Sequence, residues 1–575
     1  MPTPDLNQLF YGDNLEVLKK MDSAFVDLIY LDPPFNSDAV YNVSFANAGD
    51  AAAQIQAFDD TWRWTPETSS TYDQLVSGGG LPPLAAECLE AIRALTKESP
   101  LTAYMVAMAP RLVELHRVLK ATGSLYLHCD PTASHYLKIM LDAIFGPTMF
   151  RNEIIWRRTG AHSPRNSFGP VHDVILFYTK TPAAYFKPLK RPYSRQHVES
   201  RYTQDSKGWK FTSGGNVLTG PGATSGESGQ EWRGFNPSAK NRHWAVPGFV
   251  TEQMPESFAT LGVLDKLEAA FQAGLIEITA GKAWPEPVRY LKPTDGTSAG
   301  DIWAYQPGTA GVLYGTDAAI DEDVMYLGPT SPERLGYPTQ KPVGLLERII
   351  NASCPPDGVV LDPFCGCGTT IAAAQKLGRR WIGIDITFIA IDLIRNRLAD
   401  VFDNVEGTYE VLGIPHDLAA AHALFEKSHF EFERWAVSLV HGTPKDKPGG
   451  DSGHDGLVRF YKGKRSKPGH VVVSVKGGKQ LNPSMIRDLE GTVHRDRIAE
   501  AGILITLWDP TSGMRKYADQ APTFPDPVGN PYPTLQILTI TELLAGKIAK
   551  LPPVMRPYTQ ADSIVEDTAV PLFEM

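Results

Sequence analysis

The stretch "GVVLDPFCGCGTTIAAAQKLGRRWIGIDI", Gly358–Ile386, alternates apolar runs with a glycine-rich turn. Val359–Leu361 is typical of a short buried strand, and Trp381–Ile384 is typical of a second one. Between them lie a tight turn, Asp362–Gly368, and an alanine-rich helix, Thr369–Leu377. The stretch therefore predicts a βαβ unit, the building block of a parallel α/β sheet.

Asp385 stands at the tip of the second predicted strand, nineteen residues after Gly366. An acid at this place binds ribose hydroxyls in folds that hold nucleoside cofactors. The dinucleotide fingerprint fails because Ile371 occupies its third glycine position, and the lysine of a P-loop is missing. Both phosphate-binding motifs therefore fail. A glycine-rich loop followed by a ribose-binding acid, without a phosphate-binding motif, fits S-adenosylmethionine better than a nucleotide. Cys365 and Cys367 could also indicate a metal, but a pair of thiolates without further ligands is more typical of small loop residues.

A second polar loop, "YLDPPFNSD" at Tyr30–Asp38, follows the apolar run Val26–Leu31. Its two prolines fix φ and donate no hydrogen bond, so they predict a stiff, extended loop at the end of a buried strand. Ligands of open α/β sheets bind at that edge. Taken alone, the loop is also compatible with an ordinary turn in which Asp32 caps the local backbone.

Length and composition set outer limits. A chain of 575 residues is too long for one hydrophobic core and predicts three or four domains. The N-terminus does not resemble a signal peptide, and no apolar run approaches the ~20 residues that span a bilayer, so we expect no membrane partner. Five cysteines, an odd number, are typical of a reduced, cytoplasmic protein.

Charge is spread unevenly along the chain. The net charge of −10 disfavours a general polyanion binder. Residues 151–210 nevertheless carry twelve basic and four acidic side chains, a local excess of +8. Aromatic residues are interleaved with these bases, which favours a nucleic-acid surface over a merely solvated basic face.

Together, the two loops resemble the motifs of the amino-methylating DNA methyltransferases, which modify N6 of adenine or N4 of cytosine. That family carries D/N/S-P-P-F/Y for catalysis and D-P-F-x-G-x-G-T for the cofactor; here they read "DPPF", Asp32–Phe35, and "DPFCGCGTT", Asp362–Thr370. The catalytic motif comes first, which is the order of the family's β group. "YGDNLEVLKKM", Tyr11–Met21, and "YPTQKPVGLLERII", Tyr337–Ile350, resemble two further family segments.

The resemblance implies an α/β fold, with a doubly wound Rossmann-like methyltransferase sheet, an inserted target-recognition region and a C-terminal α/β restriction-endonuclease-like domain. The implied boundaries are 1–182 for the catalytic part, 183–330 for target recognition, 331–415 for the cofactor-binding part and 416–575 for the nuclease-like domain.

The resemblance also implies the reaction: transfer of a methyl group from S-adenosylmethionine to adenine N6 in double-stranded DNA, after the base has flipped out of the duplex. Asp32 and the Pro33 carbonyl would accept hydrogen bonds from the amino group. Pro34 would keep the loop rigid, and Phe35 would offer a stacking face to the base. The family's cytosine enzymes more often carry Ser at the first position, so Asp32 favours adenine; N4-cytosine methylation remains the alternative.

The implied cofactor site combines three segments. Asp13 would contact the cofactor's adenine, Asp385 its ribose, and the Tyr337–Ile350 segment its methionine end. The residues implied for cofactor binding are Asp13, Thr339, Lys341, Asp362, Phe364, Cys365, Gly366, Gly368, Thr369 and Asp385.

Target recognition is expected between the catalytic and cofactor-binding parts. The stretch "EWRGFNPSAKNRHW", Glu231–Trp244, mixes aromatic and basic residues. The candidates for contacts with base edges or phosphates are Arg233, Arg242 and His243. Three aromatic residues equally suit a small core: Trp232, Phe235 and Trp244. The Gly/Ser-rich tract just before them, Thr212–Gln230, predicts a segment that is mobile without a partner.

The pattern changes after about His416. A helix at His429–Val440, two strands, a further helix and a further strand resemble the Mrr-like branch of the PD-(D/E)XK nucleases. Such nucleases hold Mg²⁺ with acids and place a lysine near the attacking water. Asp455 and Lys476 would occupy the matching positions, whereas Ser474 replaces the second acid. Glu431 or Glu433, on the helix, is the candidate for the missing ligand.

Three interpretations of the whole chain remain open. It is a DNA methyltransferase with a nuclease-like DNA-binding module, a fused restriction–modification enzyme with an active Mg²⁺-dependent nuclease, or a DNA-binding protein that has lost catalysis. The intact Asp32 and Asp385 argue against the third. The expected partner is double-stranded DNA, and both a homodimer and a restriction-system partner stay open.

Overall fold

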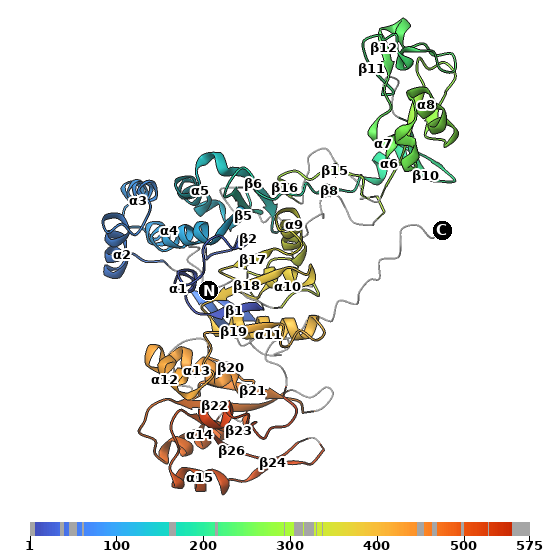
Figure 1. Ribbon diagram of the computed structural model, residues 1–575. Helices are drawn as coiled ribbons and strands as arrows, with labels where there is room; N and C mark the ends of the chain where they lie inside the picture. The colour runs from blue at the N-terminus through green and yellow to red at the C-terminus, as the bar shows by residue number, and fades with distance from the viewer. Residues whose placement is uncertain are drawn as a thin grey trace. The chain divides into compact units, whose positions relative to one another are not determined.

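The computed structural model describes residues 6–34, 40–44, 54–59, 62–159, 168–212, 217–292, 294–303, 314–315, 327–328, 331–335, 337, 339–445, 454–462, 468–495, 499–526 and 528–554. The chain divides into two compact units (Figure 1). The first comprises Met1–Lys187, Asp301–Trp303 and Val324–Pro571, and the second is built mainly from Pro188–Gly300 and Ala304–Asp323. Among the described residues, no helix combines the length and the apolar character needed to cross a membrane.

A nine-stranded sheet, in the order β16-β6-β7-β5-β2-β17-β18-β1-β19, forms the centre of the first unit. Its strands are β1 (Asn7–Tyr11), β2 (Val26–Leu31), β5 (Leu119–Cys129), β6 (Phe150–Arg157), β7 (His172–Thr179), β16 (Ile302–Trp303), β17 (Val359–Asp362), β18 (Arg380–Asp385) and β19 (Tyr409–Leu412). β7 runs antiparallel to β5 and β6, and the other neighbouring strands run parallel. A separate hairpin joins β3 (Val40–Ser44) to β4 (Gln54–Asp59).

Helices cover both faces of this sheet, because its central strands are apolar on both sides. Along β2, Ile29 and Leu31 belong to one buried cluster, whereas Leu28 and Tyr30 belong to another. The helices are α1 (Asn14–Leu18), α2 (Pro66–Ser77), α3 (Pro83–Thr96), α4 (Pro100–Val118), α5 (Pro131–Phe145), α9 (Val343–Ser353), α10 (Thr369–Lys376) and α11 (Phe388–Val401). The first cluster packs α2 to α5 on one face, and the second packs α9 to α11 on the other. The doubly wound sheet expected from the sequence is present.

The βαβ unit predicted from the glycine-rich stretch is confirmed. β17, α10 and β18 follow one another there, each within one residue of the predicted bounds. β17 lies between β2 and β18, so the DPPF loop and the glycine-rich loop leave the sheet from adjacent strands at the same edge.

The second unit contains a four-stranded sheet and a small aromatic core. Its strands are β8 (Lys190–Arg191), β9 (Thr203–Asp205), β10 (Gly208–Thr212), β11 (Thr219–Pro221), β12 (Arg242–Trp244), β13 (Ile276–Glu277), β14 (Glu286–Tyr290) and β15 (Thr297–Ser298), and its helices are α6 (Arg195–Arg201), α7 (Gly248–Thr251) and α8 (Val263–Gln272). The core expected from Trp232, Phe235 and Trp244 is confirmed. The Gly/Ser-rich tract was expected to be mobile, yet its described part folds, because β11 pairs with β12 and Leu218 is buried.

The C-terminal region belongs to the first unit and forms a five-stranded sheet in the order β20-β21-β22-β23-β26. The strands are β20 (Thr443–Pro444), β21 (Gly456–Phe460), β22 (Gly469–Lys476), β23 (Ala499–Thr506) and β26 (Leu535–Thr539), with a small hairpin of β24 (Thr523–Pro525) and β25 (Pro531–Pro533). The helices are α12 (Leu418–Lys427), α13 (His429–Ser438), α14 (Ser484–Arg495), α15 (Ser512–Asp519) and α16 (Ile540–Leu544). β20, β21 and β22 are antiparallel, and α14 leads to the parallel strand β23. The helices and strands predicted here are confirmed.

Candidate active site at the carboxyl ends of the central strands

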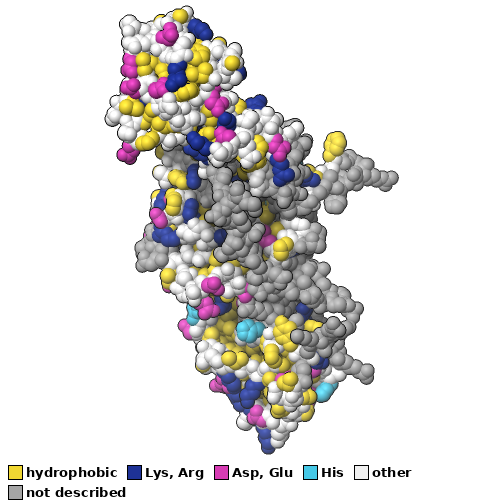
Figure 2. Space-filling view, turned by 90° about the vertical axis from the view of Figure 1, so that its right-hand side faces the viewer, with side chains coloured by type: hydrophobic (Ala, Val, Ile, Leu, Met, Phe, Trp, Pro, Cys, Tyr) yellow, Lys and Arg dark blue, Asp and Glu magenta, His cyan; other side chains and the backbone are white. Residues whose placement is uncertain are grey.

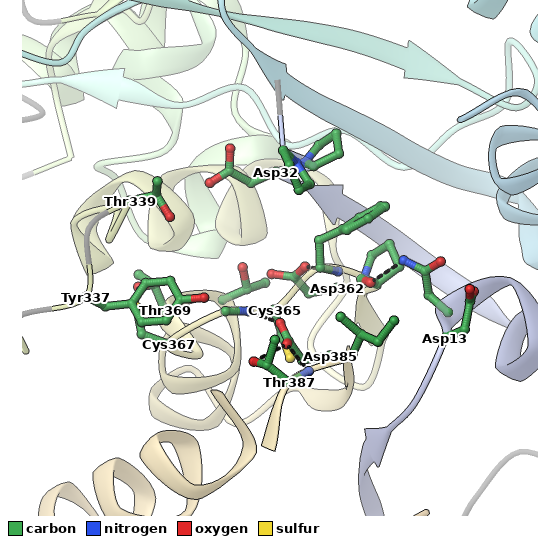
Figure 3. A pocket seen from close by; sticks show the side chains of 18 of the residues that line it. Asp13, Asp32, Tyr337, Thr339, Asp362, Cys365, Cys367, Thr369, Asp385 and Thr387 are labelled. Atoms are coloured by element: carbon green, nitrogen blue, oxygen red, sulfur yellow. Dashed lines mark hydrogen bonds between the residues drawn. The ribbon is translucent and has the colours of Figure 1, made fainter. Parts of the chain in front are cut away.

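A cavity of about 730 Å³ opens where β1, β2, β17 and β18 end. This volume falls within the range of roughly 300–1,000 Å³ that is usual for small-molecule sites. The sequence-predicted residues that line it are Asp13, Asp32, Pro33, Pro34, Thr339, Lys341, Asp362, Phe364, Cys365, Gly366, Thr369 and Asp385. Figure 3 shows Asp32 on one side of this pocket and Asp385 on another, with Asp362 between them. Gly368 lies just behind the lining, and Phe35 lies outside the described residues.

The glycine-rich loop needs two glycines for its shape. Gly366 and Gly368 have φ angles of +49° and +73°, which residues with a side chain rarely adopt. A Cβ on Gly368 would lie 2.6 Å from Cγ1 of Ile394, and one on Gly366 would lie 3.3 Å from the Tyr337 ring. Gly368 therefore lets the loop pack tightly against α11, and Gly366 lets the backbone approach Tyr337, which lines the cavity.

Asp385 is tied to this cradle. The Gly366 N–H donates to its Oδ2 at 2.9 Å, and the Thr387 N–H and hydroxyl donate to its Oδ1 at 2.9 and 2.8 Å. Burial raises the pKa of the Asp385 carboxyl to about 6, although these hydrogen bonds oppose the shift. Ile386, next in the chain, is 60% exposed and also lines the cavity. A fixed carboxylate beside an apolar surface suits a nucleoside, with a ribose diol and a flat base.

Asp13 is held by a residue that sequence reasoning missed. Arg111 on α4 donates from Nη2 to both carboxylate oxygens of Asp13 at 3.0 Å, and from Nε to Asn14 at 2.7 Å. Asn14 in turn donates to the carbonyl of Pro363 at 2.7 Å, which joins the first loop to the glycine-rich loop. Arg111 also lines the cavity. The 98 positions between Arg111 and Asp13 left no local signal of this contact.

Asp32, in the DPPF loop, pairs with Lys341. Lys341 Nζ lies 2.5 Å from Asp32 Oδ2, and both side chains are largely buried, at 10% and 16% exposed. The Lys341 carbonyl accepts a hydrogen bond from the Thr369 hydroxyl at 3.1 Å, which connects it to α10. Burial raises the pKa of the neighbouring Asp362 carboxyl to about 7, and the charge of Asp32 adds to this effect.

A chain of buried polar side chains, which the sequence did not indicate, begins at Tyr30, two residues before Asp32 of the DPPF loop. The Tyr30 hydroxyl and His128 Nδ1 are 2.8 Å apart, and His128 Nε2 and Asp173 Oδ2 are 3.0 Å apart. Arg158 lies 3.1 Å from the other oxygen of Asp173. The chain leads from the cavity wall, which Tyr30 helps to form, to the side chain of Arg158, which is 47% exposed.

The two loop cysteines are buried thiols. Burial raises the pKa of both Cys365 and Cys367 above its ordinary value, so both stay protonated at neutral pH. Within the described residues, no group of three or more His, Cys, Asp or Glu side chains could hold a metal ion. The interpretation of these cysteines as small loop residues is consistent with this geometry.

The three candidates for DNA contacts in the second unit make internal interactions. Arg233 contacts both oxygens of Glu268 at 2.6 and 2.9 Å, Arg242 donates to Thr219 at 2.6 and 3.0 Å, and His243 Nδ1 lies 3.0 Å from the Gly222 carbonyl. Figure 2 shows basic and acidic side chains intermixed on the face of this unit that it presents. Each of these three side chains is therefore engaged by a partner within the second unit, and their contact with DNA stays a prediction.

The four C-terminal candidates do come together. Burial raises the pKa of the Glu433 carboxyl to about 7, with a further contribution from the charge of Asp455, while Lys476 and Lys445 oppose the shift. Asp455 Oδ2 accepts hydrogen bonds from the Val475 N–H at 2.6 Å and from the Ser474 hydroxyl at 3.3 Å. The structure also separates the two helix acids, because Glu431 points instead to Tyr11, whose hydroxyl lies 2.9 Å away.

Comparison with known proteins agrees with the site. The family model N6_N4_Mtase, described as DNA methylase, matches residues 26–396, which include both loops. This chain belongs to that DNA methylase family.

Individual relatives of this chain include a Type II methyltransferase and a subunit of a Type III restriction-modification enzyme. The Type II methyltransferase M.EcaI of Enterobacter cloacae is 31% identical over 302 residues, covering 52% of this chain and 58% of that protein. The Mod subunit of the Type III restriction-modification enzyme StyLTI from Salmonella typhimurium is 25% identical over 386 residues, covering 64% of this chain and 50% of the subunit. The matches thus span between half and three fifths of these curated relatives. A solved structure, the cytosine-N4-specific PvuII DNA methyltransferase, aligns with 12% identity and a TM-score of 0.30, covering 75% of this chain and 92% of that one.

Proposed function

We propose that this protein transfers a methyl group from S-adenosylmethionine to adenine N6 in double-stranded DNA. The observation that carries the proposal is one continuous cavity, lined at one end by Asp32 of the DPPF loop and at another by Asp385 of the cofactor unit. The cofactor fits the residues present, since Gly366, which lines the cavity, has no side chain to fill the space beside Tyr337, and Asp385 is a fixed acceptor for ribose hydroxyls. Bound there, it supplies an electrophilic sulfonium methyl group.

The residues around Asp32 suit an amino-group nucleophile. The Asp32 carboxylate and the Pro33 carbonyl can accept hydrogen bonds from the two hydrogens of the amino group, which turns the nitrogen lone pair out of conjugation with the ring. The amino nitrogen would then take the methyl group as S-adenosylhomocysteine leaves, and the proton that it releases would pass to the Asp32 carboxylate and from there to water. The Lys341 ammonium, 2.5 Å from Asp32, fixes the carboxylate in position before the base arrives.

Adenine is the proposed base because Asp stands first in the DPPF motif, with N4-cytosine as the alternative. In either case the base must leave the duplex to reach an acid buried at the strand ends, so base flipping is part of the proposal. Incubation of the protein with tritiated S-adenosylmethionine and mixed-sequence DNA, followed by digestion to nucleosides, separates N6-methyladenine from N4-methylcytosine. Label in N4-methylcytosine would overturn the choice of base, and no label in DNA would overturn the activity.

The relatives suggest the biological setting. One of those named above is a Type II methyltransferase, and the other is the Mod subunit of a Type III restriction-modification enzyme. We therefore propose that methylation by this protein protects DNA from a cognate restriction activity, with a restriction subunit as the protein partner. Expression in cells, followed by digestion of their DNA with restriction enzymes of known sites, would show which sites become resistant.

The second candidate function is Mg²⁺-dependent DNA cleavage by the C-terminal region. One observation favours it: Glu433, Asp455 and Lys476, predicted separately from sequence, lie close enough to shift the pKa of Glu433 together. A carboxyl held near neutrality between another acid and two lysines is poised to bind a divalent cation, which would replace its proton. Ser474 would then serve as a neutral ligand in the place of the second acid.

Cleavage is tested with unmethylated DNA in the presence of Mg²⁺ or Mn²⁺. The wild-type protein should nick or cut, and Asp455→Ala should abolish this while leaving methyl transfer intact. Nicking that persists in the Asp455 variant would exclude this site, and no cleavage by the wild type would leave the region as a nuclease-like DNA-binding module.

A further inference from the structure

Helix α13 belongs to the C-terminal sheet domain, yet three of its side chains line the methyltransferase cavity. They are Phe430, Glu431 and Arg434, spaced so that they share one side of the helix. Nothing in the DPPF or glycine-rich motifs indicates a contribution from this region, which follows the last residue of the family match by more than thirty positions.

Each of these side chains is held in place. The Tyr11 hydroxyl donates to Glu431 Oε2 at 2.9 Å, and Arg434 Nη1 lies 3.3 Å from Glu431 Oε1. The Arg434 guanidinium sits 4.9 Å from the centre of the Phe430 ring, and its side chain is only 7% exposed. A buried arginine fixed by a carboxylate and a ring is a built element of the cavity wall rather than a loose surface contact.

The contact with Tyr11 shows which end of the cavity α13 borders. Tyr11 ends β1, pairs directly with Asp385 of β18, and precedes the loop that carries Asp13. The charge of Glu431 is one of the factors that raise the pKa of Asp385. α13 therefore borders the end of the cavity that holds the predicted ribose and adenine contacts, away from Asp32.

The helix is anchored to the methyltransferase part by an apolar contact as well. Phe388, the first residue of α11, joins the buried cluster formed by Phe432, Trp435 and the C-terminal strands. Its ring also meets Tyr11 edge-on, with ring centres 6.1 Å apart. Tyr11 thus lies beside Asp385 and also packs, together with Phe388, against the C-terminal core.

We propose that α13 completes the nucleoside end of the cofactor site, with Phe430 contacting the purine ring and Glu431 and Arg434 fixing that wall. The proposal rests on the proposed S-adenosylmethionine site and extends it to a second domain. It follows that cofactor binding and the docking of the C-terminal domain support each other.

The test uses the full chain and S-adenosylhomocysteine as the probe, measured by titration calorimetry. Phe430→Ala should weaken binding about tenfold, because a buried aromatic contact with the purine is lost, and Glu431→Gln should weaken it in the same direction. The matched controls are Tyr461→Ala, which removes an aromatic ring that is 55% exposed on the same domain, and Glu426→Gln on the exposed side of α12. Both controls should bind like the wild type.

A second measurement needs no variant. Hydrogen–deuterium exchange of the wild type should slow across residues 429–438 when S-adenosylhomocysteine is added. Unchanged exchange there, or unchanged affinity of a folded Phe430→Ala protein, would overturn the role of α13. If the wild type binds no S-adenosylhomocysteine at all, the proposed function itself fails, so the two failures are distinguishable.

Discussion

Asp385 and Asp362 are both carboxyls that burial pushes toward neutrality, with pKa values raised to about 6 and about 7. Ordinary aspartates titrate near 3.9, so two acids at the base of the cavity are poised to change charge within the working range of pH. Asp362 Oδ1 accepts a hydrogen bond from the Phe364 N–H at 3.0 Å and so shapes the loop. Asp385 is the acid whose charge state the cofactor would sense.

We expect cofactor affinity to rise with pH between about 5 and 7. The ionised Asp385 is the better acceptor for ribose hydroxyls, so binding favours loss of its proton, and the dissociation constant should fall as pH rises through about 6. The unliganded fold behaves in the opposite way. Because the folded pKa lies above the unfolded one, the folded state holds more protons, and this group's contribution to the stability of the fold decreases as pH rises from about 4 to about 6. Calorimetric titration with S-adenosylhomocysteine at several pH values measures the first trend. The Asp385→Asn variant should bind S-adenosylhomocysteine weakly, and its affinity should change little with pH. If its affinity still depends on pH as steeply as that of the wild type, another group is responsible for the pH dependence.

Asp32 is expected to act on the base and not on the cofactor. Asp32→Ala should lower kcat/KM for methyl transfer at least a hundredfold, because loss of a charged acceptor costs about 2.7–4 kcal/mol in the transition state. Affinity for S-adenosylhomocysteine should be preserved. The substitution also removes the partner of the largely buried Lys341. Asp32→Asn is therefore measured as well, and a thermal melt of each variant separates a loss of catalysis from a loss of folding stability.

Asp73 is an exposed acid on α2, so Asp73→Ala serves as the control for these two variants and should leave methyl transfer unchanged. Incorporation of tritium into DNA is the readout. Near wild-type turnover by a folded Asp32→Ala protein would remove this residue from the mechanism.

At the scale of single elements, the sequence predicts secondary structure that depends on neighbouring residues, but it does not predict contacts between residues far apart in the chain. The βαβ unit was predictable because strand, glycine-rich turn and helix each have their own short-range pattern within Gly358–Ile386. The contacts that complete the site join residues far apart, with 98 positions between Arg111 and Asp13 and 420 between Tyr11 and Glu431. No periodicity or motif encodes such pairs, because they arise only when α4 and α13 pack beside the end of β1 in the folded chain.

The glycine-rich loop offers a matched pair of substitutions. Gly368 and Gly378 flank α10 and have similar φ angles, +73° and +64°, but an added Cβ would clash with Ile394 at Gly368 and meet nothing within 4 Å at Gly378. Gly378→Ala should lower the free energy of unfolding by about 1–2 kcal/mol, because the only penalty is the strain of a left-handed backbone conformation. Gly368→Ala should cost roughly 1–3 kcal/mol more from overpacking, and it should also weaken cofactor binding. Chemical denaturation and calorimetry measure both effects; equal losses in the two variants would show that the loop tolerates a side chain.

At the scale of the whole chain, the C-terminal region is part of the first unit and not an appendage. Cutting the chain after about residue 416 would uncover Phe388 and Tyr11, whose rings now pack against the C-terminal core. Loss of methyl transfer in such a truncation would therefore not distinguish a DNA-binding role from damage to the cofactor site. Point substitutions in the full chain are the sharper tool.

α13 also lies between two sites. Glu431 and Glu433 are two positions apart, so they project from nearly opposite sides of the helix. Glu431 meets Tyr11 at the cofactor cavity, and Glu433 feels the charges of Asp455, Lys476 and Lys445 in the C-terminal cluster. A ligand that holds α13 on the Glu431 side therefore also positions the Glu433 carboxylate on the opposite side.

From this arrangement we expect cofactor and divalent-cation binding to be linked. S-adenosylhomocysteine should tighten Mn²⁺ binding by the C-terminal cluster about fivefold or more, since the order that the first ligand imposes on α13 no longer has to be imposed by the second. Linkage requires Mn²⁺ to tighten S-adenosylhomocysteine binding by the same factor, which gives an internal check by calorimetry. Glu433→Gln should remove the effect of Mn²⁺ while preserving cofactor affinity in its absence, and Glu431→Gln should reduce the coupling from the other side. Equal Mn²⁺ affinities with and without S-adenosylhomocysteine would mean that the two faces of α13 act independently.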